Sequence, residues 1–487
     1  MRYVFRFGFA LALSLALMAG CSDENGEGGS GGTAGTGGTG GTAGTGGMAG
    51  TGGTAGTGGM AGTGGMAGTG GTAGTGGPGG MPGCQGPEDC DDDEECTADT
   101  CSEGMCDYTA VADGTPCADG RGGCYGGLCN FVPVSVALGA TEIVFDWTTD
   151  RCDEFDIPDS PARVVRAEDG ELVLFAVHAH SNYLLRGTDF GNFEGDCHPA
   201  LESANLPTAQ SYENNEWLWS PYREGTTWHV LIHNEFHPLE PPPCNGINCW
   251  YNSITHAVST DDAYSFVKPG APAHVVAPAP DVWIPPPPGF PPSPWYVTGY
   301  LNSSNIVLGP GGYYYALFGG LAYLDNWQGT CVMRTQTLDD PASWRAWDGS
   351  GFNLAMTSPY VTGTPTEVCA VLEKPTGPLE RITDSLTYNT YLERYMLVHH
   401  LQYGICGFYF SLSSDLVHWS DLQLLAETPD PYACNGPPGY PSIIDHEDST
   451  TNFERPGQTP YIYYTKYHEY WLDRDLVRVP LTFALEE

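Results

Sequence analysis

Five apolar segments recur along the C-terminal part of the chain and set the expected architecture. Each is rich in β-branched and aromatic residues, lacks helical periodicity and is bounded by turn-forming residues, which is the pattern of a buried strand. A shorter strand with a polar turn precedes each of them, and in the first four units a further strand with a Ser/Thr and Asp turn follows. The strong segments occupy residues 171–178, 227–236, 312–320, 394–400 and 459–468.

This order of elements predicts an all-β fold over residues 134–487. A domain without helices protects its strand edges by repetition or closure, and five units of about four strands each describe a five-bladed β-propeller. A two-sheet sandwich is the alternative, but it does not predict the same three-part pattern recurring in order. In the propeller, the aromatic residue of each terminal turn, such as Trp344 or Trp419, packs between sheets.

The N-terminus has the features of an exported protein. Residues 1–20 place Arg2 and Arg6 ahead of a Leu/Ala-rich run that is too short to span a bilayer, the pattern of a cleaved signal peptide. The following "LMAGC" resembles the lipobox of bacterial lipoproteins, which implies that Cys21 becomes a lipidated N-terminus and that the protein resides in the cell envelope, at the outer membrane or cell surface. An ordinary secretion signal with an incidental cysteine is the alternative.

Residues 21–83 are largely Gly/Thr/Ala/Met repeats without the apolar side chains that a core requires. We therefore expect a disordered Gly-rich linker that acts as a tether. The 17 cysteines fit the same export hypothesis, because eight lie within 84–131 and eight more lie beyond it, and even sets are typical of disulfides in an oxidising compartment.

The segment 84–131 has few aliphatic residues, so disulfides must stabilise it. It resembles the small cysteine-rich repeats of myxobacterial secreted proteins. The acidic run from Asp91 to Glu95 is a candidate calcium ligand set or an ordinary charged loop. In the later part of the chain, the pairs Cys244/Cys249 and Cys331/Cys369 or Cys406 are candidate loop staples.

The formal net charge of −41 excludes nucleic acid as a partner, because phosphate binding requires a basic face. A membrane is then contacted through the lipid anchor only.

The turns at 334–349 ("RTQTLDDPASWRAWDG") and 411–425 ("SLSSDLVHWSDLQLL") resemble the blade signature of five-bladed propeller glycoside hydrolases of the arabinanase, arabinofuranosidase and xylosidase type. The resemblance covers most of residues 145–487. It implies a polysaccharide partner containing arabinose or xylose, no required cofactor, and a structural calcium ion in the central channel.

Polar and titratable residues gather where the strong segments end and where the preceding short strands begin. In a propeller these positions share one face, so we expect a His-rich and acidic rim around the channel mouth. More than half of the 13 histidines lie at such strand ends. The candidate substrate-binding residues are His178, His180, His233, His237, Ser304, Asn305, Arg334, His399, His400, Asp445 and His468.

Two carboxylates are the candidate catalytic pair. Asp159 matches the position where the resembled hydrolases carry their base, and Glu235 is the best acid, with a pKa that burial is expected to raise. The sequence departs from the resembled family at Ser220 and Ser304, where those enzymes usually present further acidic groups. The role of Arg334 stays open between orienting a carboxylate at the site and pairing with a neighbouring acid.

Three functions can use such a rim. Hydrolysis of extracellular polysaccharide requires the Asp159/Glu235 pair. A group of imidazoles with a carboxylate can bind a metal ion, although no compact ligand motif is present. A non-catalytic surface protein would bind a glycan or another protein through the same face. Candidate sugar-stacking rings, each of which has inter-blade packing as its alternative role, are Trp217, Trp219, Trp250, Trp295 and Trp327.

Overall fold

The computed structural model describes residues 84–485 apart from 93–94, 118–121, 132, 243, 247, 288–295, 323–326, 364–365, 404, 429–438 and 469–471. The predicted signal peptide, Cys21 and the tether lie outside the described residues. No helix in the described part is long and apolar enough to cross a membrane. The helices there are single turns: α1 (Trp147–Asp150), α2 (Pro359–Thr362), and the 3-10 turns η1 (Pro87–Asp89), η3 (Ala209–Ser211), η4 (Pro310–Gly312) and η5 (Pro341–Ser343).

The cysteine-rich segment forms two small antiparallel sheets held by four disulfides, as its composition predicted. Its buried apolar cluster consists mainly of half-cystines, so the covalent bonds replace a hydrophobic core. The pairs are Cys84–Cys101, Cys90–Cys106, Cys96–Cys124 and Cys117–Cys129. The strands are β1 (Thr97–Ser102), β2 (Met105–Ala110), β3 (Pro116–Cys117), β4 (Gly122–Tyr125) and β5 (Leu128–Phe131).

Two of the larger sheets each contain four strands that follow one another antiparallel in chain order. In both, the strong apolar segment is the second strand, as the sequence pattern predicted. The first sheet contains β8 (Arg163–Arg166), β9 (Leu172–Phe175), β10 (Tyr183–Gly187) and β11 (Glu194–Pro199). The second contains β24 (Ser385–Asn389), β25 (Arg394–Tyr403), β26 (Ile405–Ser413) and β27 (Gln423–Glu427).

Two further groups of strands are joined into one sheet by a parallel pairing of β14 with β16. The first group contains β12 (Asn215–Glu224), β13 (Thr227–Phe236), β14 (Cys249–Ser259) and β15 (Val275–Ala277). The second contains β16 (Tyr296–Leu301), β17 (Val307–Leu308), β18 (Tyr314–Ala322), β19 (Trp327–Thr335), β20 (Arg345–Ala346) and β21 (Leu354–Ala355). A separate two-stranded sheet is formed by β22 (Glu373–Lys374) and β23 (Gly377–Pro378).

The last sheet combines both ends of the domain. Its C-terminal strand pairs with two strands from the N-terminal side, so hydrogen bonds connect the start and the end of the repeat. This is one way in which a repeating β fold protects its last edge. The strands are β28 (Ser442–Ile444), β29 (Tyr461–Tyr467), β30 (Arg474–Leu485), β6 (Val134–Leu138) and β7 (Glu142–Phe145).

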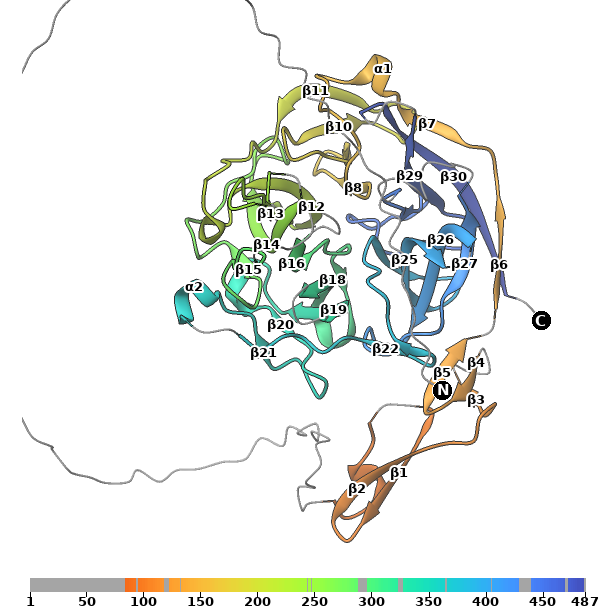
Figure 1. Ribbon diagram of the computed structural model, residues 1–487. Coiled ribbons are helices and arrows are strands. Elements are labelled where there is room, and N and C mark those ends of the chain that lie inside the picture. The colour runs from red at the N-terminus through yellow and green to blue at the C-terminus, as the bar shows by residue number, and fades with distance from the viewer. Residues whose placement is uncertain are drawn as a thin grey trace, which may run out of the picture. The chain divides into compact units, whose positions relative to one another are not determined.

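The sheets succeed one another around a common centre, which is the arrangement of a β-propeller (Figure 1). The first strands β8, β12, β24 and β28 and the short strand β17 contact each other in the pairs β8–β12, β17–β24, β24–β28 and β28–β8. The apolar side chains of neighbouring sheets merge into shared clusters, so each sheet is covered on both faces. The strand ends on one side of the centre are therefore brought close together.

The terminal turns pack as the sequence predicted. Asp415 accepts hydrogen bonds from the backbone N–H groups of Val417 and His418, so the turn is satisfied internally. Trp344 and Trp419 are buried, and each lies in a cluster that contains side chains from two neighbouring sheets. Two of the predicted loop staples are confirmed, Cys244–Cys249 and Cys331–Cys369, and Cys152–Cys197 is a third disulfide of this part.

The buried turn tryptophan provides a test of this packing. We expect Trp419→Ala to lower the free energy of unfolding by about 3–5 kcal/mol, because the cavity left between two sheets cannot close fully. Leu239→Ala is the control, since Leu239 is 72% exposed, and it should change stability by less than about 0.5 kcal/mol. Urea denaturation followed by intrinsic fluorescence measures both. Equal stability of the two variants would contradict the packing described.

Candidate functional site

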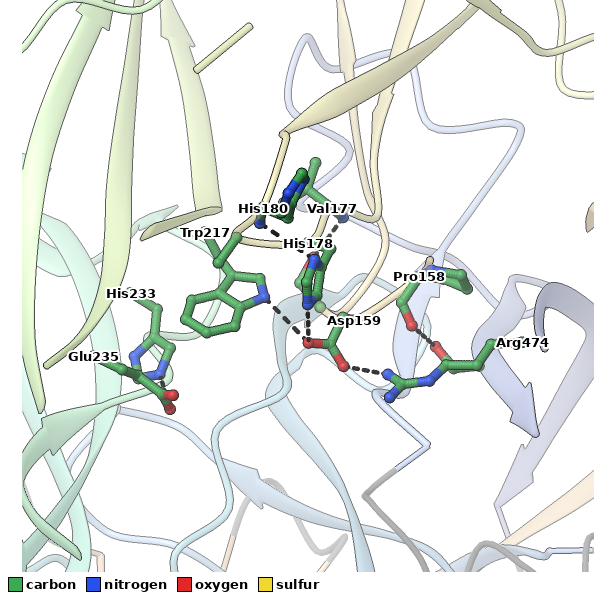
Figure 2. A network of polar contacts seen from close by, with 12 residues as sticks. Pro158, Asp159, Val177, His178, His180, Trp217, His233, Glu235 and Arg474 are labelled. Atoms are coloured by element: carbon green, nitrogen blue, oxygen red, sulfur yellow. Dashed lines mark hydrogen bonds and ion pairs between the residues drawn. The ribbon is translucent and has the colours of Figure 1, made fainter. Parts of the chain in front are cut away.

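Asp159 is the centre of a polar network just before β8 (Figure 2). The Nε1 of Trp217 donates a hydrogen bond to Oδ2 at 3.2 Å, and the Tyr440 hydroxyl donates to Oδ1 at 3.3 Å. The Arg474 guanidinium forms an ion pair with Oδ1. His178 lies slightly farther away, with its Nε2 3.9 Å from Oδ2. Four side chains from four separate segments of the chain thus surround one carboxylate.

The surroundings fix the protonation states of these partners. Burial raises the pKa of Tyr440 well above its usual range and the Asp159 charge adds to this, so the hydroxyl keeps its proton and remains a donor. Burial alone would lower the pKa of Arg474, but the Asp159 carboxylate reverses the direction and raises it. Burial lowers the pKa of His178, although Asp159 opposes the shift, so its imidazole is neutral at neutral pH. Asp159 therefore has one permanent cationic partner.

Glu235 lies near the end of β13 between two histidines. His233 Nε2 is 2.9 Å from Oε1, and His237 Nε2 is 2.7 Å from Oε2. Because side chains two residues apart in an extended strand share a face, the spacing His-x-Glu-x-His brings all three together. The sequence pattern at 233–237 thus encodes this triplet directly.

The expected rise in the pKa of Glu235 was wrong. Burial acts in that direction, but the hydrogen bonds and positive charge of His233 and His237 outweigh it and lower the pKa to about 2. The expectation failed because it considered burial and omitted the two imidazoles on the same face of the strand. Glu235 is therefore a carboxylate at any physiological pH.

The two carboxylates belong to one cluster, joined through Trp217. Trp217 on β12 stands opposite His233 on β13 in the strand register, and their ring centroids are 5.4 Å apart. The indole of Trp217 donates to Asp159, while the imidazole of His233 contacts Glu235. Figure 2 shows the two carboxylates on either side of this pair of rings. We call the set Asp159, His178, Trp217, His233, Glu235, His237, Tyr440 and Arg474 the Asp159–Glu235 cluster.

The cluster is reachable from solvent. The side chains of Asp159, Glu235 and His237 are 14%, 13% and 23% exposed. Trp250 stacks on His237 with 5.6 Å between ring centroids, and Phe155 stacks on the exposed His180 at 4.9 Å. Aromatic faces therefore lie beside polar groups that can donate and accept hydrogen bonds.

Several predicted site residues have structural contacts instead. Ser304 and Asn305 are buried, and Asn305 Oδ1 accepts from the Leu386 backbone N–H. Asp445 accepts from the N–H groups of Glu447 and Gly457 and so stabilises a turn. Asn305 Oδ1 and both carboxylate oxygens of Asp445 thus accept hydrogen bonds from backbone N–H groups.

Arg334 is located at the other end of its sheet. It pairs in register with Tyr315 at the start of β18, whereas the cluster forms where the second strands end. Its guanidinium lies over the rings of Tyr313 and Phe352, each 4.1 Å from the centroid, and donates to the Tyr315 hydroxyl. Neither role anticipated for Arg334, orienting a site carboxylate or pairing with an acid, corresponds to these aromatic contacts.

The remaining histidines form separate contacts. His399 Nδ1 lies 2.6 Å from Oδ2 of the buried Asp384, and His400 Nε2 lies 3.5 Å from the Cys406 sulfur. His468 Nε2 pairs with Asp475 at 2.8 Å. These three histidines are thus not part of the Asp159–Glu235 cluster. Trp295 lies outside the described residues, as does part of the acidic run at 91–95.

Sequence reasoning missed two members of the cluster, Tyr440 and Arg474. Both belong to the fifth unit, whose repeat pattern is degenerate, so alignment with the other units did not highlight them. The scarcity of basic residues, 18 Lys and Arg in the whole chain, was the one available signal for Arg474.

Comparison with known proteins adds little to this description. No protein-family model matches the chain, and no curated protein matches it. Among solved structures, the chain is similar to the RS223 β-xylosidase (12% identity, 67% of this chain and 93% of that chain, TM-score 0.38). It is also similar to an endo-arabinase from Bacteroides thetaiotaomicron (11%, 70% and 97%, 0.38) and to Zg3597, a family 117 glycoside hydrolase from Zobellia galactanivorans (9%, 73% and 92%, 0.43). These TM-scores are too low for the likeness to support an argument.

The contacts of Glu235 predict a characteristic acid response. A folded-state pKa of about 2 against a usual 4.5 means that ionised Glu235 contributes its full stability above about pH 4.5 and loses it as the pH falls toward 2. Glu235→Gln should therefore lower stability at pH 6 and flatten its decline in acid. Urea denaturation at a series of pH values measures this, with the exposed Glu168→Gln as control. Parallel pH profiles for wild type and Glu235→Gln would contradict the assignment.

Proposed function

We propose that this protein is an exported lipoprotein whose five-bladed β-propeller binds extracellular polysaccharide at the Asp159–Glu235 cluster. Glycans containing arabinose or xylose are the favoured ligands. The binding requires no cofactor, and the membrane is contacted only through lipid on Cys21. The disulfides of the described part support export, because such bonds persist in oxidising compartments.

The five-bladed arrangement is supported by the strand connectivity. Four groups of consecutive strands and a last sheet that combines both ends of the domain account for the five repeats of the sequence. The contacts β12–β8, β8–β28, β28–β24 and β24–β17 run in the same circular order. The first strands then surround a channel, and the Asp159–Glu235 cluster lies at one of its mouths.

The observation that supports glycan binding most directly is the pair of carboxylates joined through Trp217. Sugars present closely spaced hydroxyl groups and apolar C–H faces, so a site for them needs acceptors, donors and aromatic surfaces together. Asp159 and Glu235 are acceptors, the imidazoles are donors, and Trp250 presents a ring beside His237. All of these groups lie within one partly exposed cluster.

Hydrolysis is the second candidate function. A glycosidase needs one carboxylate and one protonated acid at the scissile bond. Asp159 can fill the first role, by polarising water or attacking carbon. Glu235 can fill the second only if a bound sugar displaces His233 or His237, because with both partners its pKa is about 2. Binding therefore has better support than hydrolysis.

Isothermal titration with arabinan, arabinoxylan and cellulose oligosaccharides tests binding. We expect wild type to bind an arabinose- or xylose-containing ligand, and His237→Ala and Glu235→Gln to weaken it at least about tenfold, since each removes a polar contact in the cluster. Arg334→Ala is the control and should bind normally, because Arg334 lies at the other end of its sheet.

Release of reducing ends from the same ligands decides between the two candidate functions. Sugar release that Glu235→Gln abolishes would establish hydrolysis, and binding without release would establish a recognition module. Failure of all the glycans to bind, or unchanged binding by both cluster variants, would contradict the proposal.

A further inference from the structure

A second cluster of titratable groups lies at the hairpin that connects β29 to β30. It contains His468, Asp473 and Asp475, whose nearest ligand atoms all lie within 4.8 Å of one another. His468 Nε2 is 2.8 Å from Asp475 Oδ2, and the His468 backbone N–H donates to the Asp473 carbonyl at 3.0 Å. The hairpin thus holds an imidazole and two carboxylates in a fixed arrangement.

This cluster is distinct from the Asp159–Glu235 cluster, although the two share a strand. Successive side chains of an extended strand point to opposite faces. Arg474 points to Asp159, so its neighbours Asp473 and Asp475 face the other way. Within the described part of the chain, the hydrogen bonds and ion pairs of these three residues do not involve Asp159 or Glu235, and the glycan-binding proposal makes no use of them.

The second cluster is also connected to the N-terminal side of the domain. The other carboxylate oxygen of Asp475, Oδ1, accepts a hydrogen bond at 3.2 Å from the backbone N–H of Trp147, the first residue of α1. Asp146 is close enough to interact electrostatically with His468. Because β7 ends directly before Asp146, the cluster lies where the closing strand leaves its pairing with β30.

The charge balance favours a cation. Two carboxylates, with the third of Asp146 nearby, surround one imidazole, and Arg474 is turned toward Asp159. Asp475 is 8% exposed and His468 is 34% exposed, so one side of the set is anchored in the fold while the other is open to solvent. An entering ion can therefore complete its coordination with water.

The ligand types narrow the choice of ion. Imidazole nitrogen with carboxylate oxygens suits Zn²⁺ and neighbouring divalent transition ions, whereas Ca²⁺ and Mg²⁺ prefer all-oxygen sites. An ion bound here would replace the direct contact between His468 Nε2 and Asp475 Oδ2.

We propose that His468, Asp473 and Asp475 form a binding site for a divalent transition ion of the Zn²⁺ class. The ion ties the β29–β30 hairpin to the start of α1 and so reinforces the closure of the domain. It also holds the strand that presents Arg474 to Asp159.

Titration of the EDTA-treated, tag-free full-length protein with Zn²⁺ alone tests the site. We expect one ion per chain, and a weakening of at least about tenfold in His468→Ala and in Asp473→Asn, because each removes one of three ligands. His418→Ala is the matched control. His418 also pairs with an aspartate, through Nδ1 at 2.7 Å from Asp415, but it is not part of the three-residue cluster.

Thermal unfolding provides a second readout. Zn²⁺ should raise the melting temperature of wild type and of His418→Ala but not of His468→Ala, since a ligand that binds only the folded state stabilises it. Absorption of the Co²⁺-substituted protein should be lost in the same variant. Absence of Zn²⁺ binding by wild type, or undiminished binding by both His468→Ala and Asp473→Asn, would overturn the proposal. Glycan titration of the metal-free protein is a separate measurement, so the two proposals can fail independently.

Discussion

The pairing of β7 with β30 is the constraint on which the rest of the molecule depends. Repeated sheets around a centre leave two open edges unless the first and last segments meet, and here β7 adds to β30 from the opposite end of the domain. The same strand begins with Arg474, which binds Asp159, and continues with Asp475, which accepts from Trp147. One strand therefore joins the two ends of the repeat and also presents Arg474 to the candidate site.

The Asp159–Glu235 cluster shows how a strongly acidic protein keeps two carboxylates together. Each carboxylate has its own cationic or hydrogen-bonding partners, with Arg474 and Tyr440 on Asp159 and two imidazoles on Glu235. Trp217 and His233 separate the two charges while bonding to one each. A ligand that enters the cluster therefore meets acceptors and donors that are already oriented, which lowers the cost of ordering them on binding.

Much of the fold could be predicted from the sequence because buried strands leave a local pattern. Four of the five strong segments are the second strands of their sheets, whereas the third segment, β18, follows both β16 and β17, and the turn around Trp419 folds as its residues indicated. The strand order predicted a shared rim for Asp159 and Glu235, and the choice of Asp159 came from the resemblance to propeller hydrolases. The remaining contacts could not be predicted, because they depend on the strand register and on the partner of each side chain. A shift of one residue turns a side chain to the other face of a strand, which is why His468 pairs with Asp475 instead of joining Asp159. The pKa of Glu235 depends on the neighbouring imidazoles, which the prediction had omitted.

The central proposal is that a sugar binds at the Asp159–Glu235 cluster. A crystal structure of the protein soaked with an arabinose- or xylose-containing oligosaccharide tests it most directly. The account predicts a sugar ring whose hydroxyls contact Asp159, Glu235 or His237 and whose apolar face lies against an aromatic ring. An oligosaccharide bound elsewhere on the domain, with the Asp159–Glu235 cluster unoccupied, would contradict it.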